Sequence, residues 1–380
     1  MKVAFWLSLG LVLYTYLGYP AWLYLASRRR RVPVKKASIL PGVSVVMAVH
    51  NEEVALPAKL ENLAALDYPA DKIQFVIASD GSDDATNQIL RSHASANLRG
   101  VFCAQHNGKA AALQEALDVC EGEIVVFVDV RQRIEPQALR YLVANFADPT
   151  IGCVSGELML CDEAGRSTSG LGFYWQIEKK MRQWEADINS TVGATGAFYA
   201  VRRSLIPKLP TGTVLDDVFI PLHAARTARV TFETQARVWD SVFPGRLEFR
   251  RKVRTLTGNY QLFELAPWIL TLSNPILFQF VSHKLCRLLV PFGFLTLLVC
   301  SLMIPEVFYR ATAACLLASC LLAALSFFRV SSRSVNRVSN FALTFLLLNT
   351  AAVVAFINFA AGRKAAWRGR SSANALARGH

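Results

Sequence analysis

The sequence predicts an α/β domain, with a mixed, mostly parallel sheet and helices on both faces, flanked by transmembrane α-helices. Three observations support this fold class. In the middle of the chain, short apolar runs alternate with segments whose apolar residues fall at helical spacing. Long apolar stretches lie outside this region, and hydrophobic residues make up 53% of the 380 residues. Only 18% are charged, a composition that excludes a disordered chain and is unusual for a purely soluble enzyme.

The net charge of +13 belongs to the flanks of the middle region rather than to that region itself. Seven Lys or Arg and no acidic residue precede position 37, and residues 258–380 hold eleven Lys or Arg against two acids. The residues in between are slightly acidic. A nucleic-acid-binding domain is expected to carry a basic stripe, so the sequence indicates that the partner is a membrane and no nucleic acid.

Four apolar stretches predict membrane spans. Residues 3–27 hold no charge and are followed at once by Arg28–Arg31, which the positive-inside tendency places in the cytoplasm. A cleaved signal peptide is the alternative, although its charges would precede its apolar core. Counting four spans from an N-terminus outside puts the C-terminal tail, 363–380, outside as well, whereas the basic residues of this tail favour the cytoplasm. One span is then re-entrant, or 258–282 crosses the membrane, or the charge rule fails. The other expected spans are about 286–304, 307–328 and 341–361.

These features divide the chain into five parts. We expect an N-terminal anchor with a basic flank, a cytoplasmic α/β domain, an interfacial segment interrupted by Pro267 and Pro275, about three transmembrane helices, and a basic tail. Eight cysteines form no CxxC pair, and a cytoplasmic domain would keep them reduced. The expected bounds of the five parts are 1–36, 37–257, 258–282, 283–362 and 363–380.

Within the α/β domain, the apolar runs 43–49, 74–79 and 124–128 predict strands buried on both faces. In open sheets of this kind, ligands bind beyond the carboxyl ends of the strands. Polar residues follow all three predicted strands, which favours a pocket there over ordinary turn chemistry. These residues are His50, Asn51 and Glu52 after the first strand, Asp80 at the second and Asp129 after the third.

Two common nucleotide-binding patterns are absent. No GxGxxG follows the first predicted strand, and Asn107–Ala110 lacks the upstream glycine and the Ser/Thr of a P-loop. Lys109 is nevertheless expected to open a helix, where a cation and free N–H groups suit a phosphate. A solvated helix start is the alternative for this lysine.

Six motifs follow one another through the α/β domain. They are PGVSVVMAVHNEE (41–53), VIASDGSDDAT (76–86), NGKAAAL (107–113), FVDVRQRIEPQAL (127–139), ATGAFYAVRR (194–203) and LDD (215–217). In this order they resemble family-2 glycosyltransferases with a GT-A nucleotide-sugar-binding fold. More narrowly, the chain resembles membrane-integrated synthases of the cellulose, hyaluronan and poly-N-acetylglucosamine type. The resemblance covers about 41–285; any one motif is weak, whereas six in order are specific.

The resemblance implies a role for each motif. Asp217 and Asp129 would be catalytic together with Arg254, and Asp129 would also hold a divalent cation, Mg or Mn. The expected acceptor-side residues are Thr195, Gly196, Phe198 and Asp216. The expected nucleotide-sugar-binding residues are Ala48, His50, Asn51, Glu52, Asp80, Lys109, Asp129, Arg131 and Arg251.

The implied chemistry needs these residue types. Sugar transfer from a nucleotide sugar must stabilise a diphosphate leaving group, which cations do, and must deprotonate an acceptor hydroxyl, which a carboxylate does. With Asp217 as the base, the acceptor attacks the face opposite the leaving group and inverts the configuration. Asp216 and Asp217 have a structural alternative, as acidic residues in the first turn of a helix.

The chain departs from the family pattern at two motifs. Arg131 replaces the second acid of the DxD motif and cannot ligate Mg²⁺, so either Asp129 holds the cation with phosphates and water, or the guanidinium takes over part of its charge. The family's QxxRW aligns with Arg251–Thr255: Arg254 is retained and suits a diphosphate, although a contact with anionic lipid is the alternative. Thr255 replaces the tryptophan that stacks on the acceptor in processive synthases.

The sequence therefore predicts a multi-pass inner-membrane glycosyltransferase with a cytoplasmic active site. It would transfer a sugar from a UDP-sugar to a growing polysaccharide or a lipid-linked acceptor for the cell surface, with polysaccharide-export proteins as expected partners. One alternative is transfer to polyprenyl phosphate, which makes a lipid-linked monosaccharide. Another is a degenerate, non-catalytic nucleotide-binding membrane protein, which Arg131 and Thr255 suggest.

Overall fold

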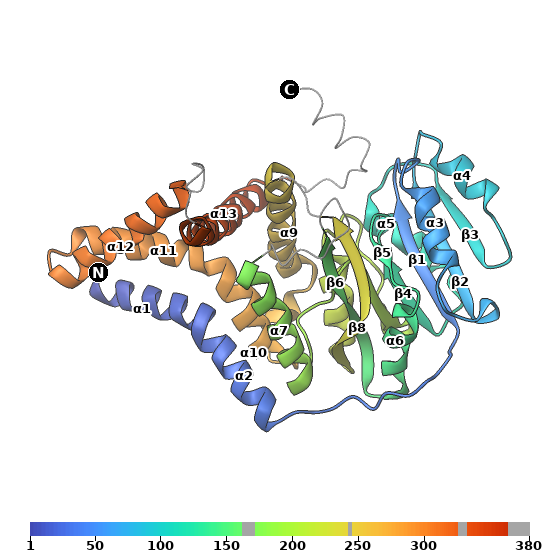
Figure 1. Cartoon of the computed structure of the whole chain (residues 1–380), viewed down its shortest axis with the longest axis horizontal. Coiled ribbons are helices and arrows are strands. Elements are labelled where there is room, and N and C mark those ends of the chain that lie inside the picture. The colour runs from blue at the N-terminus through green and yellow to red at the C-terminus, as the bar shows by residue number, and fades with distance from the viewer. Residues whose placement is uncertain (162–171, 242–244, 326–332, 364–380) are drawn as a thin grey trace.

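The computed structural model describes residues 1–161, 172–241, 245–325 and 333–363. Its α/β part is built on one eight-stranded sheet with the order β3-β2-β1-β4-β7-β6-β8-β5 (Figure 1). Strands β1 to β4 run parallel, as do β6 and β8, whereas β7 is antiparallel to β4 and β6, and β5 to β8. The strands are β1 (Val43–Val49), β2 (Ile73–Asp80), β3 (Leu98–Cys103), β4 (Ile124–Val128), β5 (Arg133–Ile134), β6 (Ile151–Cys161), β7 (Phe198–Arg202) and β8 (Arg229–Ser241).

Helices cover both faces of this sheet. Strand β1 is buried throughout, and its side chains alternate between two apolar cores: Val45 and Met47 enter the core with α3 and α6, and Val46 and Ala48 enter the core with α5 and α8. A strand covered on both faces has no polar side, which explains its continuous apolar run. The helices of this part are α3 (Leu56–Ala64), α4 (Thr86–Ser92), α5 (Lys109–Leu117), α6 (Ala138–Ala144), α7 (Gly172–Ile188), α8 (Asp216–Ala224) and α9 (Gly245–Leu265).

The structure confirms the predicted fold class, a mixed sheet covered by helices beside apolar helices. The strands expected at 43–49, 74–79 and 124–128 are β1, β2 and β4, and Lys109 is the first residue of α5. All eight cysteines are free thiols.

Four helical segments among the described residues are long and apolar enough to cross a membrane. The first, Lys2–Arg29, joins α1 (Lys2–Leu13) to α2 (Tyr19–Arg29) through a π-helical turn. The second, Leu277–Met303, joins α10 (Leu277–Phe280) to α11 (Cys286–Met303) through another π-helical turn. The other two are α12 (Val307–Ala324) and Val338–Ala360 within α13 (Arg333–Ala360).

The second candidate span begins within residues 258–282, the segment that was expected to lie at the membrane interface. Pro275 lies just before its first residue, Leu277, where the missing proline N–H breaks no helical hydrogen bond. Helix α9 likewise runs through position 257, the expected end of the α/β domain. The end of the stretch expected at 307–328 and the tail beyond Arg363 lie outside the described residues.

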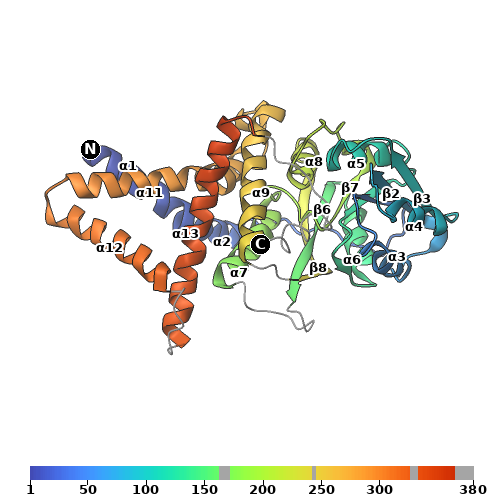
Figure 2. The same cartoon turned by 90° about the horizontal axis from the view of Figure 1, so that it is seen from above.

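Helices α1 and α11 pack together and extend away from the sheet, whereas α13 crosses them and packs mainly against α9 (Figures 1 and 2). Tyr260 of α9, Leu288 of α11 and Ala355 of α13 form a buried cluster, with Phe359 packed against it. The C-terminal end of α13 therefore lies beside the α/β part rather than at the far end of α11.

Candidate active site

Three neighbouring parallel strands, β2, β1 and β4, end at the same edge of the sheet. Strand β2 ends in Asp80, whose fully buried carboxylate accepts hydrogen bonds from the backbone N–H groups of Asn107 (2.9 Å) and Gly108 (2.8 Å). His106 Nδ1 lies 2.8 Å from Asp80 Oδ2. Asp80 thus fixes the loop before α5, and the positive φ of Gly108 (92°) turns the chain into that helix.

The loops that follow β1 and β2 are tied to one another. The backbone N–H of Asn51, a residue with φ of 54°, donates to Ser82 Oγ at 3.1 Å. The imidazole of His50 stacks on that of His106, with ring centroids 3.9 Å apart, and its Nδ1 lies 2.7 Å from the carbonyl oxygen of Asp80. These contacts hold the strand-end loops in register beside the start of α5.

Lys109 joins two carboxylates from distant parts of the chain. Its Nζ lies 3.1 Å from Asp129 Oδ1, just after β4, and 3.1 Å from Asp216 Oδ1, at the start of α8. Burial works to lower the pKa of Lys109, but the two carboxylates outweigh it and raise that pKa. Burial likewise works to raise the pKa of Asp129, but Lys109, Arg131 and Arg254 outweigh it and lower that pKa. Both groups are therefore charged at neutral pH.

Asp217 lies against the chain segment that precedes β7. A Cβ atom on Gly196 would stand 2.8 Å from Asp217 Oδ2, so only a glycine lets the carboxylate come this close. The backbone N–H of Ala194 donates to the carbonyl oxygen of Asp217 at 2.8 Å. Burial, together with the charge of Asp216, raises the pKa of Asp217 to about 6. This carboxyl is therefore mostly ionised at neutral pH and close enough to titration to accept a proton.

Arg131, which stands where the family has a second acid, is paired with an acid from another strand. Its Nη2 forms an ion pair with Asp240 Oδ2, near the end of β8, and Gln132 Nε2 donates to the same oxygen at 3.0 Å. The side chain of Asp240 is only 2% exposed. Asp240 is absent from the predicted site, because the pairing of β5 with β8 brings it here and no local pattern marks it.

The buried amine of Lys59 is a second group that sequence reasoning missed. Its Nζ donates to the carbonyl oxygen of Gln132 at 2.8 Å and so supports the turn that follows Asp129. Burial lowers the pKa of Lys59 to about 7. A lysine at helical spacing on α3 carries no sequence signal for such a role.

Lys109, Asp129, Asp216, Asp217 and Asp240 line one cavity of about 680 Å³. It lies between the strand ends, the start of α8, helix α9 and the end of α13. A second cavity, of about 830 Å³, lies around Gly42 and Leu98 at the opposite ends of β1 and β3 and contains none of the predicted site residues. The predicted residues that line the first cavity are Lys109, Asp129, Thr195, Gly196, Asp216, Asp217, Arg251 and Arg254.

Other predicted residues lie outside the lining of this cavity. Phe198 is fully buried in one apolar core and Ala48 is buried in the other, so neither side chain lines this cavity. Asp80 does not line the cavity, but its carboxylate holds the backbone of Asn107 and Gly108, which do line it. The remaining residues of this group are His50, Asn51, Glu52 and Arg131.

The comparisons with known proteins agree with this fold. Residues 44–209 match the family model described as glycosyl transferase family 2. A mannosyltransferase from Pyrobaculum calidifontis, solved with GDP-Man and Mn²⁺, aligns with 94% of this chain and 98% of its own at a TM-score of 0.70 and 22% identity. Residues 44–209 are thus similar to family 2 glycosyltransferases, and the chain shares the GT-A-like fold of that mannosyltransferase, as the resemblance implied.

Curated relatives point to the same class. The chain is 24% identical over 243 residues to the probable glycosyltransferase YdaM of Bacillus subtilis, and 26% identical over 239 residues to a poly-β-1,6-N-acetyl-D-glucosamine synthase of Staphylococcus aureus. These alignments cover 58% and 59% of this chain and 56% of each relative, so the chain spans about half their length. A β-monoglucosyldiacylglycerol synthase of Synechocystis is 30% identical over 128 residues, 33% of this chain and 27% of that protein.

Proposed function

We propose that the chain is an inverting glycosyltransferase of the inner membrane that transfers a sugar from a UDP-sugar to a growing polysaccharide or a lipid-linked acceptor, with its active site on the cytoplasmic face. One observation carries the proposal. Asp129, Asp216 and Asp217 gather around Lys109 in a single cavity that Arg254 also lines. This set supplies both a base and cations, the two things that sugar transfer needs.

Asp217 is the proposed base. Its pKa of about 6 leaves it ionised at neutral pH, and its neighbour Asp216 is already paired with Lys109. Asp217 takes the proton of the acceptor hydroxyl while that oxygen bonds to the anomeric carbon. The bond from this carbon to the diphosphate oxygen breaks, and its electron pair leaves with the nucleoside diphosphate. Attack opposite the leaving group inverts the configuration.

Lys109, Arg251 and Arg254 are the proposed partners of the leaving diphosphate. All three line the cavity, and guanidinium groups pair with phosphate oxygens through two hydrogen bonds at once. Lys109 begins α5, so free backbone N–H groups accompany its charge. Fixed cations in a partly buried site stabilise charge that develops on the leaving oxygen.

The residues fit a divalent cation that the substrate itself helps to hold. Among the described residues, no three His, Cys, Asp or Glu side chains converge on one point. Asp129 is 37% exposed and offers one carboxylate to the cavity, and Mg²⁺ usually keeps several waters and substrate phosphates beside one or two carboxylates. When bound, such a cation would neutralise part of the diphosphate charge. Asp129 is the one ligand that this chain is proposed to supply.

The proposed acceptor reaches the cavity from the membrane side. Phe359 and Arg363, at the end of α13, line the same cavity as Asp217. Thr255 lines it in the place of the family's tryptophan, so the aromatic platform of processive synthases is missing at that position. Among the relatives, one is named for a polymer product and another for a glycolipid, so both acceptor classes belong in the test.

The test is product analysis with the purified full chain in membrane vesicles. Radiolabelled UDP-glucose, UDP-N-acetylglucosamine and GDP-mannose are supplied in turn, the last because the structural neighbour was solved with it. We expect label from a UDP-sugar to enter polymer or chloroform-extractable lipid. Label in a polyprenyl phosphate monosaccharide would select that alternative instead. Nucleotide binding without turnover of any donor would contradict the proposal and favour the non-catalytic alternative.

A further inference from the structure

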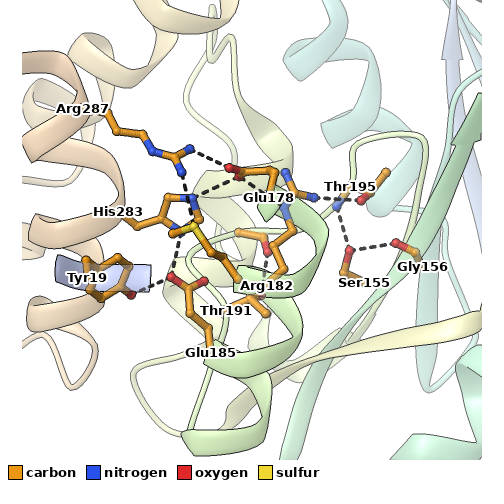
Figure 3. A network of polar contacts seen from close by, with 12 residues as sticks. Tyr19, Ser155, Gly156, Glu178, Arg182, Glu185, Thr191, Thr195, His283 and Arg287 are labelled. Carbon is orange, nitrogen blue, oxygen red and sulfur yellow. Dashed lines mark hydrogen bonds and ion pairs between the residues drawn. The ribbon is translucent and has the colours of Figure 1, made fainter. Parts of the chain in front are cut away.

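A buried polar network joins the candidate membrane helices to α7, which packs on the α/β part (Figure 3). Glu178 and Glu185 of α7 are 8% and 0% exposed. His283 lies between them, with Nδ1 2.7 Å from Glu185 Oε1 and Nε2 3.0 Å from Glu178 Oε1. The ring can donate to both carboxylates when both of its nitrogens carry hydrogen. One histidine of the second candidate span thus holds two acids of α7.

Two further groups from the candidate spans complete this network. Tyr19 of α2 donates to Glu185 Oε1 at 2.7 Å, and Arg287 of α11 donates to Glu178 Oε2 at 2.6 Å. Burial works to raise the pKa of Glu178, but Arg287 and His283 outweigh it and hold that pKa well below its usual range. Breaking a buried ion pair is costly, so these contacts fix α7 against both candidate spans.

Arg182 links this network to Thr195, on the proposed acceptor side of the cavity. It lies one turn along α7 from Glu178, with Nε 3.8 Å from Glu178 Oε1, and its Nη1 donates to Thr195 Oγ1 at 3.0 Å. The backbone N–H of Thr195 donates to Ser155 Oγ at 2.9 Å, so Thr195 is held from two sides (Figure 3). The next residue, Gly196, is the one against which Asp217 rests.

We propose that Arg182 is a positioning residue, which holds Thr195 and Gly196 against Asp217 and thereby couples the base to the seating of the membrane helices. The inference rests on the proposed role of Asp217. Without Arg182, Thr195 keeps only its backbone tether, and the chain segment beside Asp217 can move away and admit water. Burial is the main cause of the raised pKa of Asp217, and the charges of Asp216 and Asp129 add to it. The cations Lys109 and Lys284 oppose it. Hydration of this carboxyl therefore lowers its pKa.

The test is the pH dependence of kcat/KM for Arg182→Ala in the full chain, measured with the labelled nucleotide sugar that the wild type turns over. We expect the acid limb to move down by about one pH unit, toward the value of an exposed aspartate. We also expect kcat to fall about tenfold while KM for the donor stays within about twofold, because the base and not the donor site is displaced. Arg182→Lys restores the limb in part, because it keeps a donor toward Thr195.

Three other variants make the result specific. Thr195→Val keeps the shape but loses the hydroxyl, so it moves the limb in the same direction even if Arg182→Ala is not recovered in the membrane. Lys180→Ala removes an exposed cation from the same helix and leaves the limb in place. Tyr19→Phe gives a smaller shift that disappears in the Arg182→Ala background, since both act through one network.

The possible failures are distinguishable. If kcat falls in Arg182→Ala and Thr195→Val but the acid limb stays at the wild-type pH, the inference is overturned, because a loss of folded enzyme lowers the rate without moving the limb. If Asp217→Asn itself retains transfer, the proposed function fails instead.

Discussion

At the scale of single residues, the environment of Asp217 makes a prediction about pH. Its pKa, raised to about 6 by burial and by Asp216, lies well above the value near 3.9 of an exposed aspartate. A general base acts when deprotonated, so activity is present above pH 6 and is lost as the pH falls through 6. We expect kcat/KM to fall about tenfold per pH unit below this limb. A limb near pH 4 would contradict a half-buried base with a raised pKa.

The contact between Gly196 and Asp217 makes a second prediction at this scale. In Gly196→Ala, the new Cβ would stand 2.8 Å from Asp217 Oδ2, so the carboxylate or the backbone has to shift. Small displacements of a reacting group cost up to about 10²-fold in rate, and we expect a loss of that order in kcat with donor binding retained. Gly42→Ala, whose Cβ would meet its nearest neighbour at 3.8 Å, is the control. Equal activity of both variants would argue against the contact.

At the scale of elements, the turn after β4 depends on β8. Asp240 of β8 pairs with Arg131, and removing one partner of a buried pair costs about 3 kcal/mol or more. We expect Asp240→Asn to lower the Tm of the full chain in detergent, and Arg131→Met in the same chain to recover most of the loss. Arg140→Met breaks an ion pair whose partners are 40% and 46% exposed and should change Tm little. A Tm unchanged by Asp240→Asn would contradict a structural role for the pair.

The Arg131–Asp240 pair also shows which parts of the structure local sequence patterns can predict and which they cannot. Local patterns predicted β1, β2 and β4 and the start of α5, because burial on both faces and helix starts are encoded within a few residues. Strand order then explains why Asp80 and Asp129 lie at the same edge of the sheet, near the start of α5. Contacts between remote segments carry no local pattern: Arg131 and Asp240 are 109 residues apart, and His283 and Glu178 are 105 apart. Phe198 was expected at the acceptor side, but its place in β7 turns it into the core.

At the scale of the whole molecule, the path of α13 indicates on which side of the membrane the C-terminal tail begins. Arg363 lines the same cavity as Asp129 and Asp217, so the end of α13 lies on the side of the catalytic domain. This agrees with the charge of the tail rather than with a count of four complete crossings. We therefore infer that α13 does not cross the membrane in the way proposed for α1 and α11.

Protease protection of tagged full-length protein tests this topology. We expect a tag after His380 to be digested in inside-out vesicles together with the catalytic domain, and to be protected in right-side-out vesicles. A tag before Met1 is the control and should behave in the opposite way, because the basic flank after α2 predicts an N-terminus outside. Digestion of the C-terminal tag in right-side-out vesicles only would contradict the inference.

The central claim is that sugar transfer takes place in the cavity with Asp217 as the base, and one paired measurement tests it most directly. Transfer from the labelled donor and the Kd for UDP are measured on the same vesicles with wild type, Asp217→Asn and the exposed control Asp71→Asn. We predict that Asp217→Asn loses about 10²- to 10⁴-fold in transfer with its Kd unchanged, because it removes proton transfer alone. Asp71→Asn should match the wild type. Transfer at the wild-type rate by Asp217→Asn would contradict the account.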